Sequence, residues 1–242
     1  MAEPLWSPYE QIAAFFREHA ADSAYNAHYD RPAVLAALGP VSGLRVLDAA
    51  CGPGLYLREL LNRGAQVTAF DASPAMVALA RDEAAGQADV TRAVLGEPLP
   101  YPDDTFDRAI CTLAIHHAPD RHAVCAELHR VLRPGGLLVI STSHPFTDWL
   151  HRGGSYFDTS LVTDNWPTPA GQQPVSYWTE PLSAVCAAAT TAGFLIAELI
   201  EPLPAPSMRA RYPEEYRKLS EQPFFLVLRL LKPPQPGQAP QC

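Results

Sequence analysis

The stretch Val46-Leu-Asp-Ala-Ala-Cys-Gly-Pro-Gly-Leu-Tyr56 decides the fold of this chain. An apolar run ends in Asp48, and a turn that contains two glycines then leads into a segment with helical spacing. Gly52 and Gly54 remove side chains where the backbone must turn tightly and approach a ligand. This order predicts the first unit of a parallel sheet that holds its ligand beyond the carboxyl ends of the strands.

The alternation of short apolar runs with helical segments continues over residues 44–143, which is typical of a parallel sheet covered by helices. Ser73 offers an N-cap and Pro74 stands at the first helical position of one such helix. The predicted helices, including this one, cover residues 9–36, 55–63, 74–84, 121–132 and 182–192. Strands are predicted over 44–48, 66–70, 90–95, 105–113, 137–141, 194–200 and 224–231.

The segment after Ser143 has a different texture, because residues 144–180 are rich in aromatic residues, glycine, proline and threonine and show no clear period. Such a long irregular stretch is typical of a functional loop or of a disordered segment, and its aromatic content favours an ordered cap. We therefore predict one α/β domain over residues 1–242, with a doubly wound sheet. Its parts are an N-terminal helical lid (1–40), a cofactor-binding core (41–143), a substrate cap (144–180), a C-terminal helix and strands (181–232) and a tail (233–242).

Composition limits the class of function. The chain has 242 residues, and its 18 Lys+Arg against 26 Asp+Glu give a formal net charge of −8. Without basic clusters, this charge argues against a nucleic acid or an anionic membrane as a standing partner. The hydrophobic share of 48% excludes wholesale disorder. A small-molecule partner is expected, bound by a monomer or a homodimer.

The sequence predicts neither export nor membrane insertion. Its N-terminus has no basic region followed by an apolar run, and no apolar stretch reaches the roughly 18 residues that span a bilayer. The five cysteines are scattered and form no Cys-x-x-Cys pair, so neither a disulfide framework nor a metal site is expected. This cysteine usage fits a reducing cytoplasm.

A second acidic residue, Asp71, ends the next predicted strand, roughly 20 residues after the first turn, where an acid holds a ribose diol. Asp48 can accept a hydrogen bond from an amine, or orient the turn by accepting backbone N–H groups. Two acceptors at adjacent strand ends predict a ligand with a ribose and a cationic or amine-bearing tail. The alternative is a tight strand-to-helix turn with no ligand.

This pattern resembles the class I S-adenosylmethionine-dependent methyltransferases. Asp48-x-Ala50-x-Gly52-x-Gly54 is similar to the first motif of that family, and residues 67–76 are similar to the next. Residues 97–107 and 128–136 also match in order and spacing. The resemblance covers roughly residues 20–232 and implies a seven-stranded, mostly parallel, Rossmann-like sheet with a reversed last strand. It also implies S-adenosyl-L-methionine as cofactor.

The resemblance further implies how the cofactor is held. Tyr25 or Arg31 lies near its carboxylate, and Met76 covers adenine. Many relatives place an acid before the apolar residue that caps adenine, but Val94 stands there, so packing between Met76 and Leu95, helped by Glu97, is expected instead. The implied cofactor-binding positions are Tyr25, Arg31, Asp48, Ala50, Gly52, Gly54, Asp71, Ala72, Met76, Leu95, Glu97, Thr112 and His117.

A dinucleotide-binding dehydrogenase is the natural competitor on the same fold. Its fingerprint is Gly-x-Gly-x-x-Gly directly after the strand. Here Gly52-Pro-Gly54 is followed by Leu55-Tyr-Leu57, so the third glycine is absent. The sequence therefore favours the methyltransferase.

Two histidines follow the fourth and fifth predicted strands, where a side chain faces the transferred methyl group. His117 and His144 are candidates for a general base or for orienting the acceptor. The alternatives are that His117 only packs beside the cofactor and that His144 caps a turn. His116 is expected to point the other way.

The predicted cap offers aromatic walls that suit a planar or apolar acceptor, or could cradle a cation. Equally, these residues could form only the core of the cap. The candidate substrate-binding residues are Phe146, Trp149, Tyr156, Trp166, Tyr177 and Trp178.

These observations predict a methyltransferase that moves a methyl group to an O, N or C atom of a small organic acceptor, for example a secondary metabolite. A cofactor-bound enzyme that promotes cyclisation or decarboxylation instead, or a protein that senses the cofactor, needs the same turn and ribose acid. The sequence does not separate these alternatives.

Overall fold

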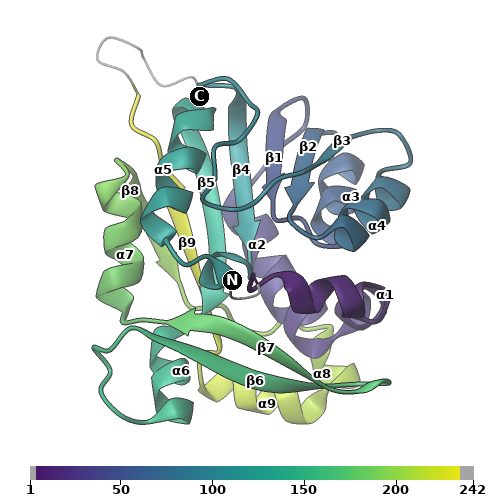
Figure 1. The fold of residues 1–242 in the computed structure, drawn as a ribbon, viewed down its shortest axis with the longest axis vertical. Helices are drawn as coiled ribbons and strands as arrows, with labels where there is room; N and C mark the ends of the chain where they lie inside the picture. Colours follow the sequence, from purple (N-terminus) through teal and green to yellow (C-terminus); the bar gives the residue numbers. More distant parts are fainter. Residues whose placement is uncertain (1–3, 235–242) are drawn as a thin grey trace.

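A seven-stranded sheet with the order β3-β2-β1-β4-β5-β9-β8 forms the centre of the computed structural model, which describes residues 4–234 (Figure 1). The first five strands pair in parallel, and β9 is antiparallel to both β5 and β8. The predicted doubly wound sheet with a reversed last strand is therefore confirmed. The strands are β1 (Arg45–Ala49), β2 (Gln66–Asp71), β3 (Asp89–Arg92), β4 (Phe106–Thr112), β5 (Leu132–Ser143), β8 (Leu195–Ile200) and β9 (Phe225–Leu231).

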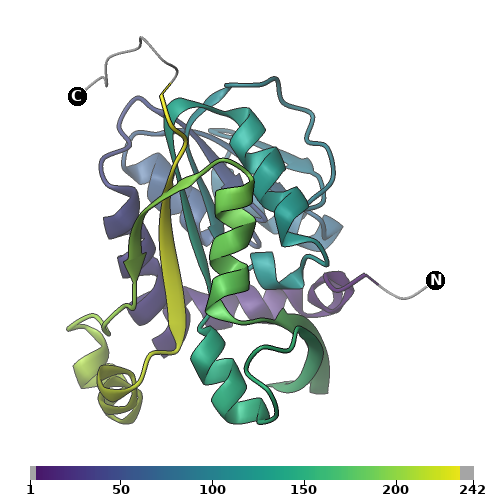
Figure 2. The ribbon, with the colours of Figure 1, turned by 90° about the vertical axis from the view of Figure 1, so that its left-hand side faces the viewer.

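Helices cover both faces of this sheet (Figure 2). Because successive side chains of a strand point to opposite faces, Val46 and Leu47 of β1 are both fully buried, each in a different core cluster. One cluster joins the sheet to α5 (Arg121–Val131) and α7 (Leu182–Thr191). The other joins it to α2 (Arg31–Leu38), α3 (Leu55–Asn62) and α4 (Pro74–Ala84).

Local sequence signals place the start of α4 as predicted. The Ser73 side chain accepts a hydrogen bond from the backbone N–H of Met76, and Pro74 occupies the first helical position. Two strand boundaries differ from prediction, since β3 ends at Arg92 and β5 already begins at Leu132. The predicted helix over 9–36 is divided into α1 (Ser7–Asp22), a short π-helix η1 (Asn26–Asp30) and α2.

The expectation of irregular backbone over residues 144–180 is wrong. This segment forms α6 (Pro145–Arg152) and a hairpin of β6 (Ser160–Thr168) and β7 (Gly171–Thr179). Pro167 and Pro174 lie in these strands, and proline is tolerated there because each strand of a two-stranded ribbon is an edge strand. Figure 1 shows the hairpin crossing beneath the carboxyl ends of the sheet, beside α1.

The remaining elements are short. A 3-10 turn, η2 (Ile115–His117), follows β4, and two helices that the sequence analysis did not predict, α8 (Met208–Arg211) and α9 (Pro213–Glu221), precede β9. Among the described helices, none has the length and apolar character needed to cross a membrane. Of the predicted tail, residues 235–242 lie outside the described residues.

Candidate functional site

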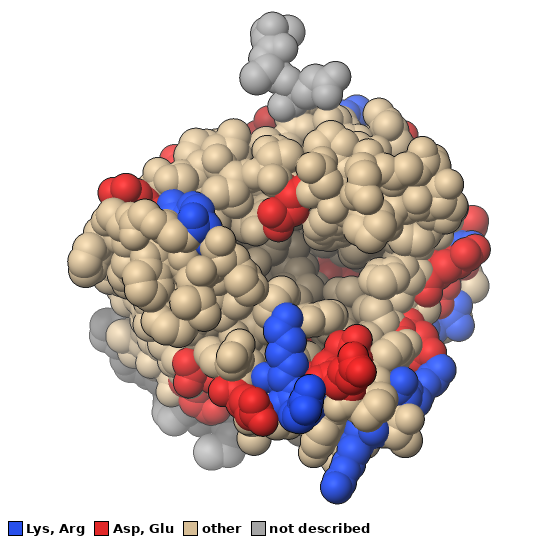
Figure 3. Space-filling model, turned by 90° about the horizontal axis from the view of Figure 1, so that it is seen from below, with Lys and Arg blue, Asp and Glu red and all other residues tan. Residues whose placement is uncertain are grey.

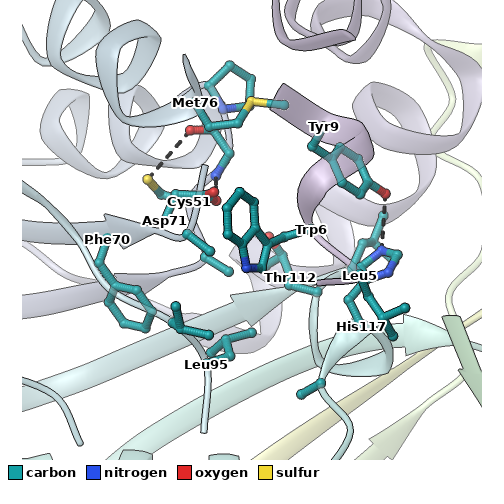
Figure 4. A pocket seen from close by; sticks show the side chains of 18 of the residues that line it. Leu5, Trp6, Tyr9, Cys51, Phe70, Asp71, Met76, Leu95, Thr112 and His117 are labelled. Carbon is teal, nitrogen blue, oxygen red and sulfur yellow. Dashed lines mark hydrogen bonds between the residues drawn. The ribbon is translucent and has the colours of Figure 1, made fainter. Parts of the chain in front are cut away.

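A cavity of about 990 Å³ lies at the carboxyl ends of the strands (Figure 4). Its walls come from the glycine turn after β1, the end of β2, the connection after β3, the end of β4 with η2, the N-terminal helices and the hairpin. The structure brings most of the predicted cofactor-binding positions to this one cavity. Those that line it are Arg31, Ala50, Gly52, Asp71, Ala72, Met76, Leu95, Glu97, Thr112 and His117.

The Asp71 carboxylate anchors the glycine turn at one side of this cavity. It accepts hydrogen bonds from the backbone N–H of Gly52 at 2.8 Å and of Ser73 at 3.0 Å. Burial raises the pKa of Asp71, while these backbone donors lower it. Each carboxylate oxygen can accept further hydrogen bonds, so both remain able to hold a ribose diol.

Left-handed backbone shapes the turn itself. Ala50, Gly52 and Gly54 have φ angles of 56°, 54° and 88°. Such angles are favourable for glycine and cost a residue with a Cβ atom about 1–2 kcal/mol. Ala50, which is not a glycine, bears this cost.

Asp48 lies outside the lining of the cavity, fully buried behind the turn. Neither of its carboxylate oxygens has a hydrogen-bond partner among the described residues. Burial, and then the nearby charge of Asp71, raises the pKa of Asp48 to about 7. Neither role predicted for Asp48, an amine acceptor or an acceptor of backbone N–H groups, is seen in these contacts.

A second buried acid, Asp30, lines the cavity beside Arg31. One oxygen of Asp30 accepts a hydrogen bond from the Tyr56 hydroxyl at 2.5 Å, and the other has no partner in the described chain. Burial raises the pKa of Asp30 to about 6. Arg31 donates to the carbonyl of Ala20 at 2.9 Å, and its buried Nε has no partner in the same part of the chain. A carboxylate oxygen and a guanidinium N–H that both lack partners among the described residues suit the ammonium and carboxylate of an amino-acid tail.

The sequence analysis missed Asp30, although an acid directly before Arg31 was a usable signal. It placed Tyr25 near the cofactor carboxylate, but the structure does not bring Tyr25 to the cavity. The Tyr25 ring packs on Phe224 and Phe225, with ring centroids 4.7 and 6.3 Å away. Gly54 also lies outside the lining, behind Pro53 and Leu55.

His117 lies at the other end of the cavity. Its Nδ1 lies 3.0 Å from the carbonyl oxygen of Ser176, and its Nε2 lies 3.0 Å from the hydroxyl of Tyr9 (Figure 4). Burial, and to a smaller degree the charge of Arg121, lowers the pKa of His117 to about 4. The side chain is therefore a neutral imidazole at neutral pH. His116 is buried and contacts the Thr142 hydroxyl instead, as its predicted opposite orientation requires.

Helix α1 and Trp6, which precedes it, line the cavity with residues that the sequence analysis did not predict. Trp6 lies in the middle of the labelled lining residues in Figure 4, and the Arg92 guanidinium stacks over its ring at 5.6 Å. Glu10 fixes this helix to the start of α4, because its carboxylate accepts from the Ser73 hydroxyl and from the backbone N–H of Ala75. No short-range sequence pattern predicts the position of residues 6–10, because they contact the core only in the folded chain.

His144 lies outside the lining of the cavity. Its Nδ1 accepts a hydrogen bond from the backbone N–H of Phe146 at 3.2 Å, as the N-cap of α6, and its Nε2 lies 3.1 Å from Glu201. Burial lowers the pKa of His144, against the opposing effect of Glu201. These contacts match the alternative that the sequence analysis left open, in which His144 only caps a turn.

Substitution of His144 by alanine is accordingly expected to lower the free energy of unfolding by about 0.5–2 kcal/mol, the cost of losing an N-cap. His144→Asn retains a capping acceptor and should recover most of this loss. Urea unfolding of the three proteins measures the difference. Wild-type stability of His144→Ala would show that the cap contributes nothing.

Among the candidate substrate-binding aromatics, Trp178 lines the cavity, together with Leu161 of the same hairpin. Trp166 stacks on Phe16, a lining residue, at a ring distance of 6.3 Å. The other candidates are placed away from the lining. They are Phe146, which is exposed, Trp149, Tyr156, whose hydroxyl accepts from the N–H of Leu182, and Tyr177, whose hydroxyl donates to Asp164.

The fold and this geometry define a class of protein. A doubly wound sheet, a glycine turn after β1 and an acid at the end of β2 form a site for a nucleoside cofactor at the carboxyl edge. One oxygen of Asp30 and the Nε of Arg31, which have no partner in residues 4–234, add a place for an amino-acid tail.

Comparisons with known proteins agree with this class. Residues 47–140 match the model of a methyltransferase domain. The chain is 39% identical over 102 residues to a malonyl-[acyl-carrier protein] O-methyltransferase of Serratia marcescens, covering 41% of this chain and 38% of the relative. It is 34% identical over 121 residues to a demethylmenaquinone methyltransferase of Tropheryma whipplei, covering 50% of each. The chain thus spans no more than half of the length of these two curated relatives.

A crystal structure of an S-adenosylmethionine-dependent methyltransferase from Mesorhizobium loti superposes with a TM-score of 0.66 at 28% identity, covering 83% of this chain and 96% of that one. The matched domain and the shared fold are those of S-adenosylmethionine-dependent methyltransferases, the family that the sequence motifs resemble. S-adenosylmethionine is the cofactor of this family.

Proposed function

We propose that this protein transfers the methyl group of S-adenosylmethionine to a small organic acceptor. The observation that carries the proposal is one continuous cavity of about 990 Å³, which joins the ribose acid Asp71 to an aromatic end at Tyr9, His117 and Trp178. This volume is at the upper end of the range for small-molecule sites.

The residues present fit each part of the cofactor. Asp71 would hold the ribose, Met76 and Leu95 would enclose adenine, and Asp30 with Arg31 would hold the ammonium and carboxylate of the tail. The fit at the tail rests on the unpartnered oxygen of Asp30 and the unpartnered Nε of Arg31. When bound, the cofactor would supply a methyl group on a cationic sulfur, and the sulfur would keep the electron pair of the bond that breaks.

The task of the chain is then to position the acceptor near that methyl group and to exclude water, which provides several kcal/mol. Helix α1 and the hairpin provide the exclusion, because both contribute lining residues. Seen from below, the molecule is hollowed near the middle, and acidic and basic side chains are interspersed around a largely uncharged surface (Figure 3). This pattern supports a small acceptor rather than a nucleic acid.

Calorimetry with S-adenosylhomocysteine, the demethylated cofactor, tests the first half of the proposal, and its formation from S-adenosylmethionine in the presence of a small-molecule cell extract tests the second. We expect binding and extract-dependent turnover. Binding without turnover would favour a cofactor sensor or a non-methylating enzyme. Absence of binding would overturn the proposal.

The pH dependence of binding follows from Asp30. An ammonium group pairs with the ionised carboxylate, whereas Asp30 of the free protein becomes protonated as the pH falls through about 6. Binding then requires loss of that proton, so the affinity for S-adenosylhomocysteine should fall between about pH 7 and pH 5. In Asp30→Asn this fall should become smaller, because only the buried acids Asp48 and Asp71 still titrate beside the turn, and the affinity should be low throughout. An unchanged pH dependence in Asp30→Asn would remove Asp30 from this role.

A further inference from the structure

We propose that the Tyr9 hydroxyl relays a proton from a neutral aromatic hydroxyl acceptor to Nε2 of His117, which makes the protein a methyltransferase of phenol-type oxygen. This inference rests on the proposed function and names its substrate class. Three observations carry it: the tautomer of His117, the bond between Tyr9 and His117, and the charges along the cavity.

The contacts of His117 fix where its proton lies. The Ser176 carbonyl can only accept, so the Nδ1 atom 3.0 Å away must carry the imidazole proton. Nε2 therefore presents its lone pair, and the Tyr9 hydroxyl, 3.0 Å away, donates to it. The phenol oxygen of Tyr9 keeps a lone pair that can accept a hydrogen bond from an acceptor hydroxyl.

Tyr9 cannot serve as the base alone. Burial, and then the charge of Asp71, raises the pKa of Tyr9, so its free phenolate is disfavoured. The acceptor proton must therefore arrive at the Tyr9 oxygen as the original Tyr9 proton moves to Nε2. In the same step the acceptor oxygen forms its bond to the methyl carbon, while the bond from that carbon to sulfur breaks and its electron pair stays on sulfur. His117, whose lowered pKa makes it too weak a base to form a free phenolate beforehand, ends as an imidazolium that returns its proton to solvent.

The charges along the cavity select a neutral acceptor. The charged lining residues are Asp30, Arg31, Asp71, Arg92 and Glu97; none of them is a hydrogen-bond partner of His117, and the one whose charge reaches Tyr9, Asp71, is an acid. The half around Tyr9 and His117 is lined by the uncharged side chains of Phe16, Pro119, Leu161 and Trp178.

The nearby guanidinium of Arg121 is already paired. It contacts the carboxylate of Glu180 and donates to the carbonyl of Trp178 at 2.7 Å. A carboxylate acceptor would thus find no uncommitted cation among the described residues of this half. A flat, neutral ring with a hydroxyl group fits its aromatic walls.

The groups around His117 also set the pH range of the relay. They are Tyr9 from α1, the Ser176 carbonyl from β7, Arg121 from α5 and the adjacent His116. With the pKa of His117 lowered to about 4, the neutral imidazole is available from mildly acidic pH upward. Turnover of a phenol that requires the relay should then vary little between about pH 6 and pH 8.

The acceptor class is tested by calorimetry on protein saturated with S-adenosylhomocysteine, with 2-naphthol, 2-naphthoate and 2-naphthylmethylammonium as matched probes. We expect 2-naphthol to bind at least about tenfold more tightly than either charged probe, given the cost of burying an unpaired charge. Equal or tighter binding of a charged probe would overturn the proposed class. Failure to bind S-adenosylhomocysteine itself would instead overturn the proposed function.

The relay is tested by the Tyr9→Phe variant. Transfer to 2-naphthol should fall by about 100-fold or more, the usual contribution of proton transfer. Transfer to 4-nitrophenol at about pH 8, where this probe is already an anion and needs no base, should fall less than about threefold. His117→Asn should show the same contrast. Tyr101→Phe, which removes a hydroxyl bonded to Thr91 at 3.1 Å outside this cavity, is the control and should match the native protein with both probes.

Equal losses with both probes would mean that Tyr9 only supports the fold, and the relay would be overturned. So would native turnover of 2-naphthol by Tyr9→Phe. Absence of transfer to either phenol by native protein that binds S-adenosylhomocysteine would overturn the acceptor class and leave the proposed function standing.

Discussion

Replacement of Asp71 by alanine is expected to weaken the binding of S-adenosylhomocysteine by about 1–3 kcal/mol, or about 5- to 150-fold. The variant loses the acceptor for the ribose hydroxyls. It also leaves the N–H groups of Gly52 and Ser73 without their 2.8 Å and 3.0 Å partner, so the turn itself becomes less ordered. Isothermal titration calorimetry measures the change.

Two further variants test whether a loss of affinity in Asp71→Ala comes from the missing hydrogen-bond acceptor. Asp71→Asn keeps an oxygen for one N–H group and should lose less affinity than Asp71→Ala. Asp89→Ala removes an exposed acid from the start of the neighbouring strand β3 and should bind like the native protein. Native affinity of Asp71→Ala, with its fold intact by circular dichroism, would remove Asp71 from its assigned role.

Gly54→Ala is expected to lower the free energy of unfolding by about 2–5 kcal/mol. Gly54 has a φ of 88°, and a Cβ atom there would lie 3.0 Å from the Cα of Ala80 and 3.2 Å from the Cβ of Glu83. Left-handed backbone costs about 1–2 kcal/mol for alanine, and forcing α3 and α4 apart costs about 1–3 kcal/mol more.

Gly52→Ala is the matched control for this effect. Gly52 has a φ of 54°, and a Cβ atom added to it would meet nothing within 4 Å. Its substitution should therefore cost only the backbone contribution, about 1–2 kcal/mol. Urea unfolding compares the two variants. Equal losses would show that close packing at Gly54 adds nothing to the requirement for left-handed backbone.

The two predictions also explain why this turn is readable in a sequence. Gly54 is required by the approach of α4, and Asp71 is required by the N–H groups that the turn leaves unpaired. Both requirements act on neighbouring units of one sheet, about 20 residues apart along the chain. The spacing of residue types therefore predicts the turn and the acid at the end of β2, and ten of the thirteen cofactor positions that the resemblance implied line the cavity.

The segment after β5 shows where such sequence patterns no longer predict the structure. Residues 160–179 form a hairpin, but Pro167 and Pro174 interrupt its sequence and few of its side chains are buried. A strand with no buried face has no alternation to detect. The same holds for His144, whose position after a strand indicated a catalytic group, while the backbone of α6 turned its ring toward the N–H of Phe146.

The amino-acid sequence by itself determined the doubly wound sheet, the glycine turn and the acid at the end of β2, because each follows from the periodicity of one strand or helix and from backbone angles within a few residues. Only the tertiary structure decided which residues meet at the end of the cavity that is proposed to hold the acceptor. Tyr9, His117 and Ser176 come from α1, η2 and β7, which are separated by up to 167 residues and meet through packing alone. Contacts of that kind depend on how whole helices and strands pack against one another, and short-range sequence patterns do not predict that packing.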